Sequence, residues 1–262
     1  MKNTGSCALV TGASAGIGQE IARLFAKDGH HLFLVARRRE RLEALANQLS
    51  AQHQVSVGVL VEDLANPGAP GRILEQVRKA GVGIDFLVND AGFGSHGNFA
   101  EADREVELRM VDVNVRAVVE LCHRFLPAML ARRQGRILNF ASVAGFVPGP
   151  LMATYYASKA FVLSFTEALA AELRGTGVTA TAACPGPTRT EFGRVAKTDE
   201  TRLFRIGVAD AASVARHAYQ AMMAGKVVAI PGFMNKVNAF LPRLGPRSVV
   251  RGLVARLNRK RA

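Results

Sequence analysis

Short apolar runs alternate along the chain with longer stretches in which apolar residues recur every third or fourth position. The short runs predict strands, and the longer stretches predict amphipathic helices. The predicted strands are Ser6–Thr11, His31–Val35, Val55–Val61, Phe86–Asn89, Arg136–Phe140, Val178–Ala183 and Val227–Ile230. The predicted helices lie at about Gly18–Asp28, Glu40–Gln52, Pro70–Ala80, Glu101–Arg132, Tyr155–Arg174 and Ala211–Ala224. This alternation indicates βαβ units and an α/β fold, a doubly wound parallel sheet of about seven strands with helices on both faces.

A length of 262 residues suits a single α/β domain, which we assign to residues 1–232, with residues 233–262 as a C-terminal extension. The sequence contains no run of about 18 apolar residues, which disfavours a membrane-spanning helix. A strand-like run begins too close to Met1 to leave room for a signal peptide. The three cysteines, Cys7, Cys122 and Cys184, lack metal-ligand spacing. We therefore expect a cytoplasmic protein without a metal site or a disulfide framework.

The formal net charge of +13 is concentrated in the last part of the chain. No acidic residue follows Asp210, whereas basic residues continue to the end of the sequence. A charge of this size favours acidic partners or surfaces but does not choose among them.

The first predicted strand leads into a glycine-rich turn and then into a helix. The turn reads Thr11-Gly12-Ala13-Ser14-Ala15-Gly16-Ile17-Gly18. Glycines allow a sharp turn and let backbone N–H groups approach a pyrophosphate at a helix N-terminus. Because a strand precedes the turn and a helix follows it, the turn predicts a dinucleotide site. The cofactor-binding candidates of the turn are Gly12, Ser14, Gly16, Ile17 and Gly18.

The end of the second predicted strand indicates which nicotinamide cofactor is used. A carboxylate there binds the ribose hydroxyls of NAD, whereas a basic residue accommodates the 2′-phosphate of NADP. The sequence has Arg37-Arg38-Arg39 and no acidic residue before Glu40, so NADP(H) is favoured, with Arg37 as the first candidate ligand and Arg38 as the second. After the third strand, Asp63 either caps the turn or contacts adenine.

A serine, a tyrosine and a lysine follow the fifth predicted strand. Ser142 comes at the end of the strand, and Tyr155 and Lys159 are one helical turn apart on one helix face. A lysine ammonium stabilises an ionised tyrosine, so we expect the pKa of Tyr155 to fall towards neutral pH. Such a tyrosine suits acid–base chemistry on an alcohol or a ketone.

Together these segments resemble the short-chain dehydrogenase/reductase family in its single-domain, Rossmann-like branch. The resemblance covers roughly residues 5–230. The matching residues are Thr11-Gly12, Gly16, Gly18, Asn89-Asp90-Ala91-Gly92, Asn114, Ser142, Tyr155, Lys159 and Pro185-Gly186.

The resemblance implies a role for each matching residue. Tyr155 would be the acid/base, Lys159 would bind the nicotinamide ribose and lower the tyrosine pKa, and Ser142 would hold the substrate oxygen. Asn114 would anchor a water that relays protons to the lysine. Asn89, Ala91 and Gly92 would line the adenosine side, and Pro185, Gly186 and Thr188 would contact the nicotinamide end. Tyr156 lacks the four-residue spacing to Lys159, and we interpret it as a packing residue.

One position departs from the family. Many members have two asparagines where this chain has Asn89-Asp90, and an ionised Asp90 cannot donate an amide N–H. Ser142, Tyr155 and Lys159 are nevertheless all present. They favour an NADP(H)-dependent oxidoreductase that interconverts a carbonyl and an alcohol over a catalytically silent NADP(H)-binding sensor or partner-binding protein. The resemblance further implies the reductive direction and a homodimer or homotetramer.

Substrate choice is expected to lie with a lid at residues 188–207, which mixes apolar and basic residues. This mixture suits a hydrophobic or acyl substrate with an anionic group, but an ordinary mobile lid would look the same. Phe93, Phe146, Leu151 and Met152 are further candidates for the pocket wall.

The extension contains a basic amphipathic segment. Val249, Val250, Leu253, Val254 and Leu257 recur at helical spacing, with arginines between them. Such a helix can lie on an anionic membrane surface. It can also pack against a second subunit or against its own domain, which is commoner for this fold. Nucleic acid is disfavoured, because aromatic stacking residues are absent there.

Overall fold

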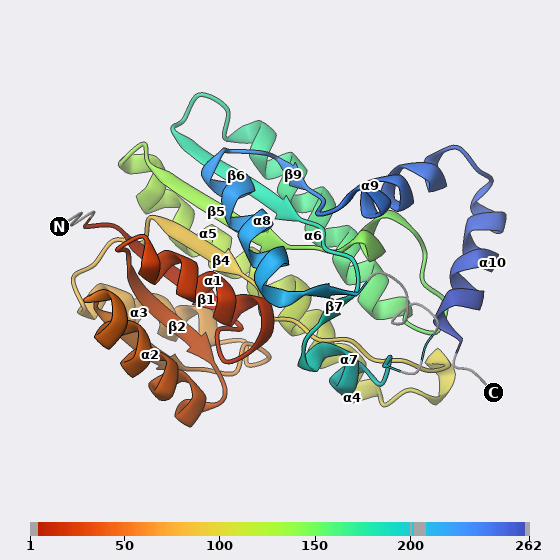
Figure 1. Ribbon diagram of the computed structural model, residues 1–262, viewed down its shortest axis with the longest axis horizontal. Coiled ribbons are helices and arrows are strands. Elements are labelled where there is room, and N and C mark those ends of the chain that lie inside the picture. The colour runs from red at the N-terminus through yellow and green to blue at the C-terminus, as the bar shows by residue number, and fades with distance from the viewer. Residues whose placement is uncertain (1–4, 200, 202–207, 260–262) are drawn as a thin grey trace.

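The computed structural model describes residues 5–199, 201 and 208–259. Its centre is a parallel seven-stranded sheet with the order β3-β2-β1-β4-β5-β6-β9, which confirms the predicted doubly wound α/β fold (Figure 1). The strands are β1 (Cys7–Thr11), β2 (His31–Ala36), β3 (Val57–Val61), β4 (Phe86–Asn89), β5 (Gly135–Phe140), β6 (Val178–Ala183) and β9 (Val228–Ala229).

Helices cover both faces of the sheet because each strand is apolar on both sides. One layer is formed by α1 (Gly16–Lys27), α2 (Arg39–His53) and α8 (Ala211–Met223), and the other by α3 (Ala69–Lys79), α5 (Ala117–Ala131) and α6 (Ala153–Glu172). Burial on both faces is typical of parallel sheets. The three cysteines, Cys7, Cys122 and Cys184, are buried and free.

The long helix predicted at Glu101–Arg132 is interrupted in the structure. Asp103 accepts hydrogen bonds from the backbone N–H groups of Glu105 and Val106, so α4 begins only at Arg104 and runs to Val111. A π-helical turn at Asp112–Arg116 separates α4 from α5. Such turns widen a helix locally, and the apolar periodicity of the sequence does not reveal them.

The predicted lid contains regular structure. Thr188–Arg189 (β7) pairs with Ala209–Asp210 (β8), and the short helix α7 spans Glu191–Ala196. The predicted lid residues 200 and 202–207 lie outside the described residues.

The C-terminal extension forms α9 (Phe233–Phe240), a 3₁₀ turn (Leu241–Arg243) and α10 (Arg247–Asn258). The end of α10 is attached to the domain through Asn258, which is 1% exposed. Its side chain accepts a hydrogen bond from the Tyr156 hydroxyl at 3.2 Å and donates one to the Pro150 carbonyl at 2.9 Å. Its backbone oxygen lies 2.6 Å from Nε2 of His96. No helix among the described residues is long and apolar enough to cross a membrane.

Candidate active site

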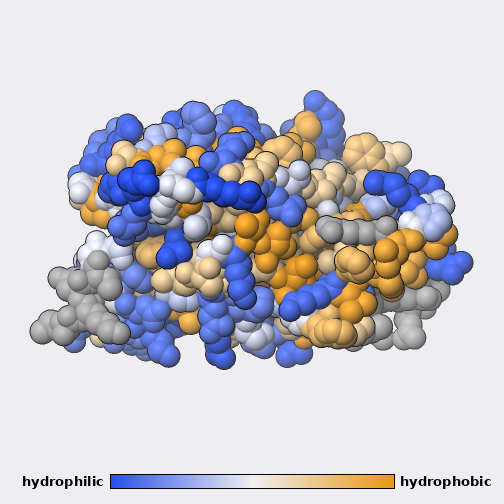
Figure 2. Space-filling model, turned by 90° about the horizontal axis from the view of Figure 1, so that it is seen from above, coloured by the Kyte–Doolittle hydropathy of each residue, from blue (hydrophilic) through white to orange (hydrophobic). Residues whose placement is uncertain are grey.

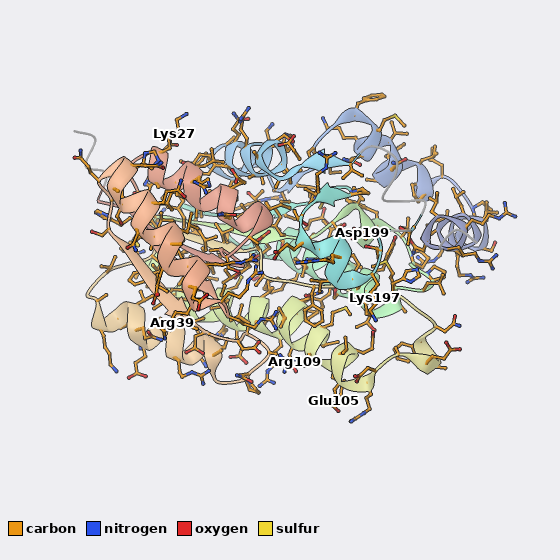
Figure 3. The ribbon with its side chains drawn as sticks, turned by 60° about the horizontal axis from the view of Figure 1, so that its bottom comes forward. Lys27, Arg39, Glu105, Arg109, Lys197 and Asp199 are labelled. Atoms are coloured by element: carbon orange, nitrogen blue, oxygen red, sulfur yellow. The ribbon has the colours of Figure 1, made fainter. Side chains whose placement is uncertain are left out.

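A cleft of about 2020 Å³ follows the carboxyl ends of the strands. The strand order reverses beside β1, which pairs with β2 on one side and β4 on the other. Loops on the two sides of such a reversal point diverge and leave a ligand-binding crevice. Figure 3 shows α7, followed by Lys197 and Asp199, across from α4, which carries Glu105 and Arg109, and both helices contribute to the cleft wall.

The glycine-rich turn forms one end of this cleft. Gly12 and Gly16 have φ values of +72° and +60°, which side chains disfavour. Gly18 has no positive φ, but a Cβ there would lie 2.8 Å from the Gly12 carbonyl oxygen. Gly12, Ser14, Gly16 and Ile17 line the cleft, whereas Gly18 is buried beneath it and allows the close approach of the helix. The turn therefore fits a pyrophosphate.

Several arginines follow β2 at the same end of the cleft. Arg38 donates to Ser14 Oγ at 3.0 Å and forms an ion pair of 2.6 Å with Glu191, the first residue of α7. Arg41 binds the other oxygen of Glu191 at 2.9 Å, and the hydrogen bonds from Arg38 and Arg41 lower the pKa of Glu191 to about 2. Arg37 also lines the cleft and is exposed. No motif in the sequence indicated that Glu191 would lie beside these arginines.

Asp63 has the turn-capping role that the sequence allowed. Its Oδ1 accepts a hydrogen bond from the Ala65 N–H at 3.0 Å, and its Oδ2 pairs with Arg109 at 2.8 Å. Asp63 lies on the cleft wall as well.

The predicted catalytic residues come together in the middle of the cleft. Ser142 is hydrogen-bonded to Tyr155, and it also accepts from the Ala144 N–H at 3.1 Å. Lys159 Nζ lies 5.9 Å from the centre of the Tyr155 ring and donates to the Phe140 carbonyl at 2.7 Å. The structure therefore brings the serine, tyrosine and lysine to one place.

Asn114 occupies the π-helical turn. It accepts from the Phe93 N–H at 3.1 Å and donates to the Phe93 carbonyl at 2.9 Å and to Ser158 Oγ at 3.0 Å. A Cβ on Gly92 would lie 3.0 Å from Asn114 Oδ1 and 3.5 Å from Lys159 Nζ, so Gly92 separates the two side chains. Asn114 thus fixes the loop after β4 beside the lysine.

The expected fall in the pKa of Tyr155 is wrong for this structure. Burial raises the pKa of the phenol above its usual value, and the hydrogen bond with Ser142 only partly offsets this shift. Lys159 donates a hydrogen bond to the Phe140 carbonyl, and its charge does not offset the effect of burial on the phenol. Tyr155 is accordingly protonated at neutral pH.

Lys159 is coupled to Asp90, the residue that departs from the family pattern. Burial lowers the pKa of Lys159 to about 8, and the charge of Asp90 acts in the opposite direction. Burial raises the pKa of Asp90 to about 7, and Lys159 and the Gly18 N–H act against that shift. Asp90 thus packs against the glycine turn, and its charge acts on the lysine.

The other predicted cofactor residues divide into two groups. Ala91, Gly92, Pro185, Gly186 and Thr188 line the cleft. Asn89 is not among the described residues of the cleft wall. It is 3% exposed and donates to Asn139 Oδ1 on the neighbouring strand at 2.8 Å. The expected adenosine contact of Asn89 is therefore replaced by a bond within the sheet.

The substrate side of the cleft is largely apolar. Of the predicted wall residues, Phe93, Leu151 and Met152 line it, whereas Phe146 packs against a separate apolar cluster. Phe192 of α7 contacts the Tyr155 ring at 5.1 Å between ring centres. Tyr156 packs edge-on against Tyr155 and is 5% exposed, as interpreted from the sequence.

The C-terminal extension contributes wall residues that the sequence did not assign to the site. They come from α9, the turn after it and α10, and they include Met234, Leu241, Val250, Val254 and Leu257. Helical spacing indicated that α10 is amphipathic, but it did not reveal what its apolar face covers.

Comparisons with known proteins agree with this geometry. The sequence profile of the short chain dehydrogenase family matches residues 6–201. A sulfoacetaldehyde reductase of Chromohalobacter salexigens is 39% identical over 189 residues, 70% of this chain and 73% of that protein. A very-long-chain 3-oxoacyl-CoA reductase of Anas platyrhynchos is 34% identical over 200 residues, 74% of this chain but only 63% of that protein.

A solved structure is also similar over nearly the whole length. The short-chain dehydrogenase from Sphingobium yanoikuyae in complex with NADPH has a TM-score of 0.82 and 33% identity, with coverage of 94% of this chain and 96% of that one.

Proposed function

Because the chain belongs to the short-chain dehydrogenase family, we propose that it is an NADP(H)-dependent oxidoreductase that reduces a carbonyl group to an alcohol on a hydrophobic or acyl-type substrate. The single observation that carries this proposal is the meeting of Ser142, Tyr155 and Lys159 in the cleft, where Lys159 Nζ lies 5.9 Å from the centre of the Tyr155 ring. The phenol is protonated at neutral pH and so has a proton to give, which reduction of a carbonyl requires, and a neighbouring ammonium favours the phenolate that forms.

Each residue has a separate task in this reaction. Ser142 and Tyr155 donate hydrogen bonds to the carbonyl oxygen, where negative charge develops. The bound nicotinamide supplies the hydride. Tyr155 gives up its proton, and the Lys159 ammonium stabilises the resulting phenolate. Asn114 holds the loop after β4 against the lysine.

Tyr155→Phe tests the reaction. The variant keeps the ring that packs against Phe192 and Tyr156 but has no proton to donate. We expect kcat for NADPH-dependent reduction of a ketone panel to fall by roughly 10²–10⁴-fold, the usual contribution of a general acid. Tyr156→Phe is the matched control, and its kcat should stay within a few-fold of wild type. Undiminished turnover by Tyr155→Phe would refute Tyr155 as the general acid, and this function with it.

The choice of NADP(H) rests on the residues around the adenosine ribose. Arg37, Arg38 and Ser14 offer donors to a 2′-phosphate, and no carboxylate stands directly after β2 to bind ribose hydroxyls. Arg37→Ala should raise the Kd for NADPH at least tenfold and leave that for NADH nearly unchanged, as measured by fluorescence titration. An equal loss for both cofactors would contradict the phosphate role.

The substrate class rests on the apolar cleft wall. Phe93, Met152, Phe192 and the C-terminal helices surround the space beside Tyr155 with hydrophobic side chains. Such a wall favours a bulky apolar ketone or an acyl chain over a small polar carbonyl compound. A panel of ketones, aldehydes, 3-oxoacyl thioesters and steroids, followed at the NADPH absorbance, tests this order.

The proposal also includes the oligomeric state and the location: the protein forms a homodimer or homotetramer in the cytoplasm. Phe161 on α6 is 41% exposed and stacks on Phe165, 5.9 Å away between ring centres. An exposed aromatic ring that stacks on a half-buried one on a domain helix suits a subunit interface. Sedimentation velocity with Phe161→Ser tests it: dissociation is expected, and an unchanged monomer in both proteins would contradict it.

A further inference from the structure

The helix α9 exposes its apolar face to solvent. Phe233, Val237, Phe240 and Leu241 recur at spacings that place them on one side of the helix, and Leu244 follows the next turn. Phe233 is 78% exposed, Phe240 57% and Leu244 72%. The other side of α9 faces the domain with small or polar residues: Ala239 is buried, and Asn235 donates to the Pro231 carbonyl at 2.7 Å. This is the reverse of an ordinary surface helix.

The apolar surface continues onto α10, where Val249 is 65% and Leu253 58% exposed. Figure 2 looks onto this side and shows hydrophobic surface in the middle of the molecule and towards the end that carries α9 and α10. A contiguous apolar surface of this kind marks an interaction site. We call the exposed side chains of Phe233, Met234, Phe240, Leu241, Leu244, Val249 and Leu253 the α9–α10 surface.

The charge around this surface has a single sign. The sequence contains no acidic residue after Asp210, and Lys236, Arg247, Arg251 and Arg256 are exposed on α9 and α10. Apolar side chains flanked by lysine and arginine match the interfacial region and the headgroups of an anionic bilayer. A second copy of the chain fits less well, because a symmetric contact would bring two basic, acid-free segments together.

We propose that the α9–α10 surface docks the protein on an anionic lipid bilayer. All members of this surface except Phe240 and Leu244 also line the cleft, so the docked protein presents the mouth of the cleft to the acyl chains. A hydrophobic substrate can then pass from the bilayer into the cleft. This last statement rests on the proposed function, whereas docking itself does not.

Flotation of the full-length protein with vesicles tests docking without any enzymatic assay. Wild type should float with vesicles of phosphatidylcholine and phosphatidylglycerol and less with phosphatidylcholine alone. High salt should weaken binding to the anionic vesicles, because it screens the lysines and arginines. Phe240→Ser/Leu244→Ser, whose positions lie outside the cleft wall, should reduce the partition coefficient by roughly tenfold or more. Val82→Ser is the control, because Val82 is also an exposed apolar residue but lies on the loop before β4. This variant should float like wild type.

A charge-reversal variant tests docking independently, in case the serine variant folds poorly. Lys236→Glu/Arg251→Glu should weaken binding to anionic vesicles by at least roughly fivefold per reversed residue, and Arg78→Glu on α3 should not. Failure of wild type to float with anionic vesicles would overturn the proposal. A lipid-free dimer that Phe240→Ser/Leu244→Ser dissociates would assign the surface to a second copy instead and would also overturn it. Loss of ketone reduction in Tyr155→Phe leaves docking unaffected, so the two proposals fail separately.

Discussion

The charge of Asp90 acts on the ionisation of Lys159, against the larger effect of burial. Lys159 is charged below its pKa of about 8, and the negative charge of Asp90 raises that pKa. Asp90→Asn removes this charge, so the pKa of Lys159 should fall further. Because the phenolate of Tyr155 needs the ammonium, the alkaline limit of kcat/KM for reduction should move to lower pH. A pH profile with NADPH between about pH 6 and 10 measures this shift.

The same experiment can contradict the coupling. An alkaline limit that stays in place in Asp90→Asn would mean that another group controls it. Asp112→Asn, which removes an exposed carboxylate paired with Arg116 on the π-helical turn, provides the control and should leave the profile unchanged.

In the proposed complex with NADP(H), Glu191 competes with the 2′-phosphate for arginine. Its two oxygens bind Arg38 at 2.6 Å and Arg41 at 2.9 Å, at the end of the cleft that fits the 2′-phosphate. Glu191→Gln removes the anion and frees both guanidinium groups, so NADPH should bind several-fold more tightly while NADH binding is unchanged. Isothermal titration with both cofactors measures the difference.

Glu43→Gln is the matched control, because Glu43 pairs with Arg39 at 3.2 Å on the exposed side of α2. Weaker NADPH binding by Glu191→Gln would show the opposite role, in which the carboxylate holds Arg38 in place for the phosphate.

For Tyr155, the sequence predicted the position of the side chain but not the direction of its pKa shift. The spacing to Lys159 correctly brought the two side chains to one helix face. The direction of the pKa shift was wrong, because it depends on how far the phenol is buried and on where the lysine donates. Both are properties of the surrounding loops, which come from distant parts of the chain.

At the scale of elements, one asparagine attaches α10 to the domain. Asn258→Ala leaves the Tyr156 hydroxyl and the Pro150 carbonyl without their bonds to this side chain. An unpaired buried group costs roughly 1–3 kcal/mol, so α10 should open more readily than the sheet. Hydrogen exchange of α10 amides should accelerate roughly tenfold or more while β1 and β4 keep their protection.

Asn47→Ala on α2 controls for the loss of an asparagine, because Asn47 is exposed. Equal exchange of α10 in Asn258→Ala and wild type would show that apolar packing of Val250 and Val254 alone holds the helix.

The bounds of most helices and strands followed from apolar periodicity, whereas the region around Asn114 did not. One continuous helix was predicted where the structure has α4, a π-helical turn and α5. Apolar spacing averages over such a turn, and the hydrogen bonds of Asn114 to Phe93 and Ser158 form only after the loop and α6 are in place.

For the whole molecule, stability depends on the layer of α1, α2 and α8. Phe25 is fully buried and lies about 5 Å, between ring centres, from both Phe86 on β4 and Tyr219 on α8. Phe25→Ala should lower the free energy of unfolding by roughly 3–5 kcal/mol, measured by urea denaturation. Phe99→Ala, at a position 68% exposed, should change it by less than roughly 0.5 kcal/mol. A similar, small effect of both would contradict this view of the core.

The sequence by itself determined the alternation of strands and helices, the glycine turn, the arginines after β2 and the serine, tyrosine and lysine. These features are local, because backbone conformation and side-chain spacing along one element depend on neighbouring residues. Only the tertiary structure decided that Asn89 bonds within the sheet, that Asp90 is coupled to Lys159 and that Glu191 binds Arg38. It also brought the C-terminal helices to the cleft and left the apolar face of α9 in solvent. The physical reason is that burial, ionisation and exposure depend on residues far apart in the chain, and these meet only when the sheet and its two helical layers are assembled.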